Sequence, residues 1–218
     1  MLVKRTDLLT GEPYYEDLTT RTMFRRTVGG IAWPYGNQSG TVVILGEKRT
    51  PSNNGRGRRH IYMLKEFRSM ESEELLVNAS LFQRRYMPDL YVMLCDEPRY
   101  ILLEEYNDRQ RRARRPILRT DHPSTWHGKG EGLIQYYAEL VRRRIGDEKS
   151  LFFGKDCSAR DAFRNLRPDD VGKKAMELPH VCAFAWALEY FDVNPMAEWG
   201  ERGFGGKMNI IADSIGGY

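Results

Sequence analysis

The sequence predicts an α/β fold in which a mixed sheet, with three antiparallel strands followed by a parallel central strand, is flanked by helices. Three observations indicate it. The apolar stretches 28–33 and 41–46 are separated by a turn rich in Gly, Pro and Asn, which is typical of paired strands. Residues 90–95 are nearly all apolar, as expected for a parallel strand covered on both faces. Residues 178–191 are apolar nearly all round, which predicts a buried helix against that sheet.

Composition indicates one globular core. The chain has 218 residues, of which 41% are hydrophobic, so it needs neither disulfides nor a structural metal to fold. Its three cysteines are odd in number and lack a C-x-x-C pair, which favours a reducing compartment. No apolar run reaches the roughly 18 residues of a membrane span, and the N-terminus has no secretion signal. We therefore expect a soluble intracellular or virion protein with no membrane partner.

The chain divides into three parts by pattern. Residues 1–26 carry little periodicity and are predicted to form an N-terminal arm or linker. The core domain is expected over residues 27–192. Residues 193–218 are rich in glycine and are predicted to be an irregular tail, of the kind that orders on a partner.

A third strand and a helix are predicted next. Residues 60–67 alternate between apolar and polar, which indicates a half-buried strand with Glu66 on one face. The following apolar residues recur at helical spacing up to Tyr86, and either Ser69 or Ser72 is expected to cap this helix.

Two acids, Asp96 and Glu97, follow the central strand. Open α/β sheets usually place their chemistry at the carboxyl ends of such strands. Asp96 equally suits the N-cap of a helix over residues 99–106, so both interpretations stay open. A basic connection over residues 109–115 and a short strand over residues 116–120 are expected to follow.

The remaining predicted elements alternate. Residues 129–144 carry an apolar stripe typical of an amphipathic helix. Residues 151–153 predict a short strand, and residues 158–166 a short helix that ends at Pro168. The buried helix described above then closes the domain.

Basic residues gather in clusters although the net charge is only +4. Clustered arginines can follow a phosphate backbone, whereas the alternative is an ordinary solvated surface. The candidate nucleic-acid-binding residues are Arg56, Arg58, Arg59, Arg109, Arg111, Arg112, Arg114, Arg115 and Lys129.

This order of elements is the ribonuclease H-like arrangement, and five strings resemble one family of that fold. They are G-G-I-A-W-P-Y-G-N-Q-S-G-T-V-V-I-L-G, I-Y-M-L-K-E-F-R, L-C-D-E-P, G-K-G-E-G-L-I-Q-Y-Y-A-E-L and H-V-C-A-F-A-W-A-L. They resemble the nuclease domain of the large terminase subunit of tailed bacteriophages, over residues 27–192. The family's ATPase half is missing, because no G-x-x-x-x-G-K-[ST] string occurs, so the chain does not by itself fuel DNA translocation.

The resemblance implies two-metal phosphodiester hydrolysis, in which three acids hold two Mg²⁺ or Mn²⁺ ions. The first acid position falls on Ala32. The second falls on Asp96, with Glu97 beside it. The third falls on Cys182, whose soft sulfur suits magnesium poorly. Two of the three positions therefore lack an acid.

Two hypotheses follow. In the first, the chain is a pseudo-nuclease associated with phage DNA packaging that needs no metal and serves as a structural module. Its partners would be DNA, a separate packaging ATPase, a portal or another virion protein, in the host cytoplasm or in the virion. In the second, it is an active endonuclease that binds Mg²⁺ or Mn²⁺ through Asp96, with Glu97 and Glu66 as further catalytic acids. Other candidates for a displaced acid are Asp121, Asp161 and Asp192.

Overall fold

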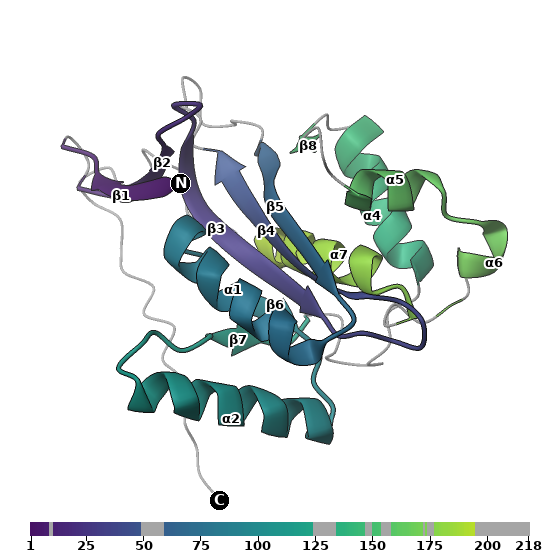
Figure 1. Ribbon diagram of the computed structural model, residues 1–218. Helices are drawn as coiled ribbons and strands as arrows, with labels where there is room; N and C mark the ends of the chain where they lie inside the picture. The colour runs from purple at the N-terminus through teal and green to yellow at the C-terminus, as the bar shows by residue number, and fades with distance from the viewer. Residues whose placement is uncertain are drawn as a thin grey trace, which may run out of the picture.

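The computed structural model describes residues 1–8, 11–48, 59–123, 134–146, 150–153, 158–171, 173 and 177–194 (Figure 1). Its strands are β1 (Leu2–Thr6), β2 (Pro13–Asp17), β3 (Met23–Ala32), β4 (Gly40–Lys48), β5 (Ile61–Ser69), β6 (Tyr91–Met93), β7 (Thr120–Asp121) and β8 (Leu151–Phe152). Its described helices are α1 (Ser72–Tyr86), α2 (Glu97–Arg112), α4 (Ile134–Gly146), α5 (Ser158–Arg164), α6 (Pro168–Val171) and α7 (Pro179–Val193).

One mixed sheet holds all of these strands. β3, β4 and β5 are antiparallel neighbours, whereas β6 pairs parallel with both β3 and β7. β8 adds to the far side of β5, also in parallel. The predicted fold class, a ribonuclease H-like mixed sheet flanked by helices, is therefore confirmed. β6 is buried on both faces, as its unbroken apolar sequence predicts.

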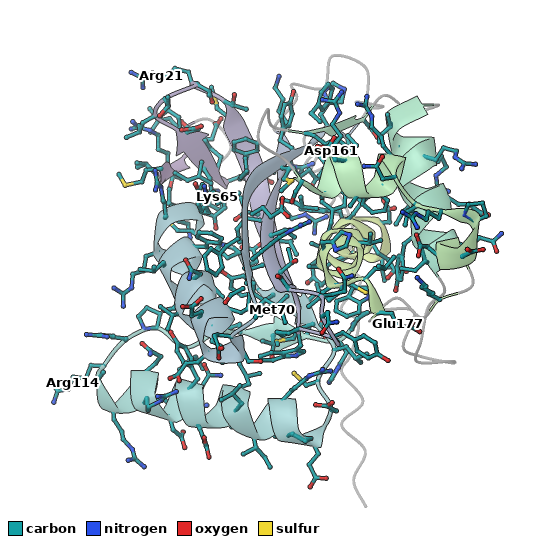
Figure 2. All side chains as sticks on the ribbon, turned by 45° about the vertical axis from the view of Figure 1, so that its right-hand side comes forward. Arg21, Lys65, Met70, Arg114, Asp161 and Glu177 are labelled. Atoms are coloured by element: carbon teal, nitrogen blue, oxygen red, sulfur yellow. The ribbon has the colours of Figure 1, made fainter. Side chains whose placement is uncertain are left out.

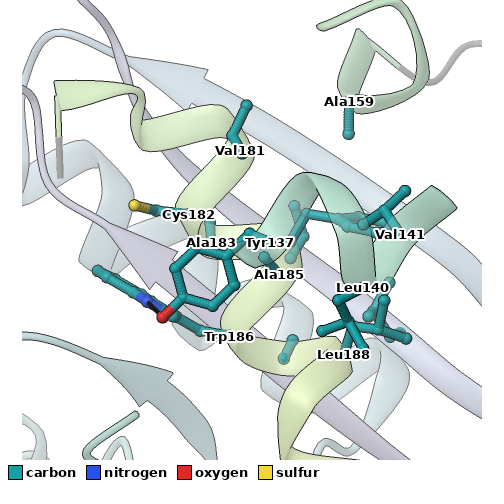
Figure 3. Packing of buried hydrophobic residues seen from close by; sticks show 14 of the residues in the cluster. Tyr137, Leu140, Val141, Ala159, Val181, Cys182, Ala183, Ala185, Trp186 and Leu188 are labelled. Carbon is teal, nitrogen blue, oxygen red and sulfur yellow. Dashed lines mark hydrogen bonds between the residues drawn. The ribbon is translucent and has the colours of Figure 1, made fainter. Parts of the chain in front are cut away.

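Helices cover both faces of the sheet (Figure 1). Alternate residues of β3 face opposite ways, so Val28 packs towards α4, α5 and α7 while Ile31 packs towards α1 and α2. Figure 3 shows the first of these cores, where Tyr137 of α4 lies beside Trp186 of α7. The Tyr137 hydroxyl accepts a hydrogen bond from the Trp186 indole N–H at 3.0 Å. In the part of the chain that is described, no helix is long and apolar enough to cross a membrane.

The N-terminal segment differs from expectation. β1 and β2, which were predicted to belong to an arm or linker, pair with each other and extend the sheet at the start of β3. Leu2, Tyr15 and Phe24 form a small core of their own there. Each strand contributes few buried side chains, so its periodicity is too weak to detect, and pairing with β3 supplies the order. The limits of the three-part division stay a prediction, and residues 195–218 lie outside the described residues.

Two helix boundaries also differ from the predicted ones. α1 begins after Glu71, which makes no side-chain cap, so neither Ser69 nor Ser72 is the N-cap. The Ser69 hydroxyl instead accepts from the Glu71 N–H at 2.9 Å and donates to Glu74 at 2.6 Å. Pro168 begins α6 rather than ending α5, as the first position of a helix tolerates proline.

α2 is longer than predicted. It runs through Arg112, so Arg109, Arg111 and Arg112 lie on a helix and not in a basic connection. The strand expected over residues 116–120 is present only as β7. The residues before it are hydrogen-bonded to the side-chain amides of Gln83 and Asn107 and not to a neighbouring strand. The start predicted for α4 falls in residues 124–133, outside the described part of the chain.

Candidate functional site

The carboxyl ends of β3 and β6 lie side by side and position the candidate site. The register pairs Gly29 with Tyr91 and Ile31 with Met93, so Ala32 and Leu94 come at the same edge of the sheet. α7 crosses the face of this sheet that α4 and α5 also cover, and residues of α7 share one apolar core with Ala32. The fold therefore brings the first two positions of the expected acid set to one edge.

Apolar side chains and one cation surround Ala32. A small hollow is lined by Ala32, Trp33, Leu94, Arg99 and Trp186. Its volume is about 10 Å³, close to the smallest space that holds one water molecule. Hard divalent ions need several oxygen ligands, and this wall presents none from a carboxylate.

Arg99 supplies a fixed positive charge at this edge. Its Nη2 donates to the Pro34 carbonyl oxygen at 3.2 Å, and its Nη1 lies 3.4 Å from Asp96 Oδ2. The guanidinium is thus held between the β3–β4 turn and the start of α2. Because like charges repel, it opposes the binding of a divalent cation beside Ala32.

Asp96 is the N-cap of α2. Its Oδ1 accepts from the Arg99 backbone N–H at 3.1 Å, while Oδ2 faces the Arg99 guanidinium. Glu97 is exposed in the first helical turn, where its charge is favourable to the helix dipole. Of the two interpretations left open by the sequence, the structure displays the capping role, and both Asp96 oxygens have a partner in Arg99.

Cys182 is fully buried on α7. Burial raises the pKa of its thiol well above the usual range, so the thiol stays neutral. Because the thiolate is the form that binds metals, this position offers no ligand.

Glu66 lies on β5, two strands away from β3, and its carboxylate is already engaged. It accepts from the Ser158 N–H at 3.1 Å and from the Ser158 hydroxyl. The Arg68 Nε donates to it at 2.8 Å. Glu66 therefore anchors the start of α5 to the sheet, and the structure does not bring it together with Asp96 and Glu97.

The other candidate acids are spread over three elements. Asp121 is exposed on β7, and Asp161 is exposed on α5 (Figure 2). Asp192, near the end of α7, is ion-paired with Arg144. Among the described residues, no three His, Cys, Asp or Glu side chains are grouped so that they could hold a metal ion.

The predicted basic residues fall into different environments. Arg59 donates to the Phe191 carbonyl oxygen at 2.9 Å and pairs with Glu47 at 3.5 Å. Arg109 and Arg111 form exposed ion pairs with acids of α1 and α2. Arg112, Arg114 and Arg115 are exposed at the end of α2, and Arg56, Arg58 and Lys129 lie outside the described residues.

Arg99 and Trp186 line the site but were not predicted from the sequence. Arg99 follows Asp96 by three residues, a spacing that places an arginine beside an N-cap aspartate once the helix is recognised. Nothing in the sequence points from Trp186 to Ala32, because their proximity depends on how α7 crosses the sheet.

His180 is a half-buried group next to the charged residues of β5. Burial, followed by the nearby Arg68 cation, lowers the pKa of His180, while Glu66 and Asp170 act in the opposite direction. The folded state therefore binds a proton at His180 less readily than the unfolded chain does. Stability contributed by this group is present above the ordinary histidine pKa of about 6.5 and is lost as pH falls through the lower folded value.

A histidine titration followed by NMR is expected to show His180 with a midpoint below that ordinary value. Between about pH 6.5 and the folded midpoint, the unfolding free energy of the parent chain is expected to fall as the pH is lowered, because the unfolded chain protonates His180 first. Denaturant unfolding should show a smaller fall in His180→Gln, which has no imidazole to protonate. A His180 midpoint at or above the ordinary value would contradict the role given to burial.

Comparisons with known proteins give structural matches alone. No protein-family model and no curated protein sequence matches the chain. The nuclease domain of the large terminase of bacteriophage SPP1, solved with bound Mn, is 17% identical with a TM-score of 0.44 and covers 76% of this chain and 86% of its own. The Fowlpox virus resolvase, solved with Holliday junction DNA, is 11% identical with a TM-score of 0.43. The match covers 77% of this chain and 99% of the resolvase chain.

A third match is the RuvC structure of Thermus thermophilus, which is 13% identical with a TM-score of 0.39 and covers 78% of this chain and 97% of its own. Likenesses of this size say nothing about activity. What the chain itself displays is a ribonuclease H-like sheet in which the three positions expected to hold acids carry a buried alanine, a helix-capping aspartate and a buried cysteine.

Proposed function

We propose that this chain is a terminase-nuclease-like domain that has lost two-metal catalysis and works as a structural module binding DNA or other proteins of phage DNA packaging. The observation that carries the proposal is the surroundings of Ala32. An apolar wall and the Arg99 guanidinium lie where the resemblance implies metal ions held by carboxylates.

The chemistry of this edge supports the proposal. Two-metal hydrolysis needs two cations about 4 Å apart, held by acids that balance their charge. Here one carboxylate, Asp96, already faces the positive charge of Arg99. A divalent ion at this edge would have to displace the guanidinium and would still lack oxygen ligands from Ala32 and Cys182.

The preserved architecture supports a binding role. The mixed sheet and the close packing of α7 are complete although two of the expected acids are replaced. A fold provides a scaffold, and its function depends on the groups at the site. The partners proposed are DNA, a separate packaging ATPase, a portal or another virion protein, in the host cytoplasm or the virion.

A plasmid-nicking assay of the purified chain with Mn²⁺ or Mg²⁺ tests the proposal. We expect no cleavage above the buffer blank, and no heat of Mn²⁺ binding by calorimetry. Asp96→Asn is a clean probe because asparagine caps helices as well as aspartate does, so the fold should survive.

Asp169→Asn is the matched control, since it neutralises an exposed acid on α6 that is not among the candidate catalytic acids. Cleavage that disappears in Asp96→Asn and persists in Asp169→Asn would overturn the proposal. That outcome would favour the active endonuclease with displaced acids.

A further inference from the structure

Two neighbouring hollows lie on the α1–α2 side of the sheet, on the face opposite to α7. The first, of about 290 Å³, lies between α1 and the last turns of α2 and is lined by Arg84, Arg109 and Arg115. The second, of about 530 Å³, is lined by Arg84, Lys4 and Arg119. Arg84 lines both hollows, so they are adjacent, and their cations together are called here the basic groove, defined by Lys4, Arg84, Arg109, Arg115 and Arg119.

Positive charge dominates the basic groove. Its five cations face two carboxylates, Glu73 and Asp89. Glu73 is already paired with Arg109 at 2.7 Å. Within the described part of the chain, no acid is within ion-pair distance of Arg84, Arg115 or Arg119. Unpaired cations that converge on one concave surface raise its potential and attract a polyanion.

The backbone presents these cations from a rigid base. Arg114 adopts a left-handed conformation with φ of 54° after the last turn of α2, and the Arg115 N–H donates to the Gln110 carbonyl at 2.9 Å. This turn reverses the chain. Figure 2 shows Arg114 at this end of α2, pointing away from the body of the protein.

Two side-chain amides then fix the returning segment. The buried Asn107 accepts from the Leu118 N–H at 2.9 Å and donates to the Leu118 carbonyl at 3.3 Å. Gln83 of α1 donates to the Ile117 carbonyl at 2.9 Å. Arg115 and Arg119 therefore project from a stretch that is hydrogen-bonded to both helices, so little ordering is needed when a ligand binds.

The lining favours a phosphate backbone over unpaired bases. Single-strand binding relies on exposed rings that stack on bases. The aromatic side chains of the groove, Tyr15 and Tyr106, are 9% and 5% exposed, so they offer no such platform. Arginine guanidinium groups match phosphate oxygens in charge and geometry.

We propose that the basic groove binds the phosphate backbone of duplex DNA, on the face of the sheet opposite to α7. The inference rests on the proposed function for the class of partner and adds the surface that contacts it. Arg109 and Arg115 belong to the predicted set of DNA-binding residues, while Lys4, Arg84 and Arg119 are new to it.

The test compares two double variants of the full chain by fluorescence anisotropy on a mixed-sequence duplex at several salt concentrations. Arg84→Gln with Arg119→Gln removes two groove cations that have no described ion-pair partner. Arg142→Gln with Arg160→Gln removes two exposed cations from α4 and α5, on the other face. The groove variant is expected to bind more weakly, with a log–log salt slope flatter by about two, since each phosphate contact contributes close to one. The control should match the parent chain.

Three outcomes would overturn the proposal. Equal losses in both variants would show diffuse attraction over the whole surface, and no loss in the groove variant would place the DNA elsewhere. Polyglutamate that displaces the duplex at equal charge would indicate an acidic protein as the partner. None of these results bears on metal-dependent cleavage, which the nicking assay decides separately.

Discussion

Gly30→Ala is expected to lower the unfolding free energy by about 3 kcal/mol or more, at the upper end of what overpacking a core costs. A Cβ atom at residue 30 would lie 1.8 Å from the Ala183 carbonyl oxygen and 2.7 Å from its carbonyl carbon. Both are backbone atoms of α7, so no side-chain rotation relieves the clash. The helix would have to move off the sheet and open the core it shares with β3.

Gly146→Ala is the matched control for that change. Nothing lies within 4 Å of a Cβ added at residue 146, in the last turn of α4. The control is expected to be neutral or to gain less than about 1 kcal/mol, because alanine favours the helix. Urea unfolding followed by circular dichroism measures both. An unchanged midpoint for Gly30→Ala would refute the close approach of α7 to β3.

Glu47→Gln is expected to cost about 3–5 kcal/mol, the usual loss when one partner of a buried ion pair is removed. Glu47 is 2% exposed and pairs with Arg26 at 2.8 Å and Arg59 at 3.5 Å. Both arginines also donate to the Phe191 carbonyl oxygen, at 3.4 Å and 2.9 Å. The variant keeps the shape of the side chain but leaves two guanidinium charges without their counter-charge.

The exposed pair of Glu73 and Arg109 provides the comparison. Their side chains are 58% and 55% exposed, so water screens the interaction. Glu73→Gln is expected to cost less than about 1 kcal/mol. Thermal or urea unfolding of both glutamine variants at neutral pH checks the difference. Equal, small losses in both would show that Glu47 does not act as a buried counter-ion.

Gly30→Ala and Glu47→Gln probe the two ends of α7. Gly30 admits the helix near its beginning, and the charges around Glu47 hold the Phe191 carbonyl near its end. Between these points the helix places Trp186 against the hollow beside Ala32. The edge at Ala32 is therefore built into the packing of the domain, and an acid introduced at residue 32 alone would be buried against Trp33, Leu94 and Trp186.

Local pattern was sufficient for the main architecture. The unbroken apolar run of β6 predicted a strand buried on both faces, and α7 was predicted from an apolar surface without a polar side. Both could be read from the sequence because an element that is buried on all sides carries apolar residues at nearly every position. The placement of Ala32 at a sheet edge was likewise readable from the strand and the turn that follows it.

Contacts between distant residues decided the rest. The β1–β2 hairpin is ordered by pairing with β3, and Glu66 is engaged by Ser158, 92 residues away. Both depend on partners that no local pattern identifies.

The sequence by itself determined the sheet, its central strand and its closing helix. Tertiary structure alone decided what surrounds Ala32: the Arg99 guanidinium is held by the Pro34 carbonyl, and Trp186 of α7 closes the hollow beside Ala32. The physical reason is that hydrophobic periodicity specifies which face of an element is buried, while the crossing of elements specifies which side chains meet there.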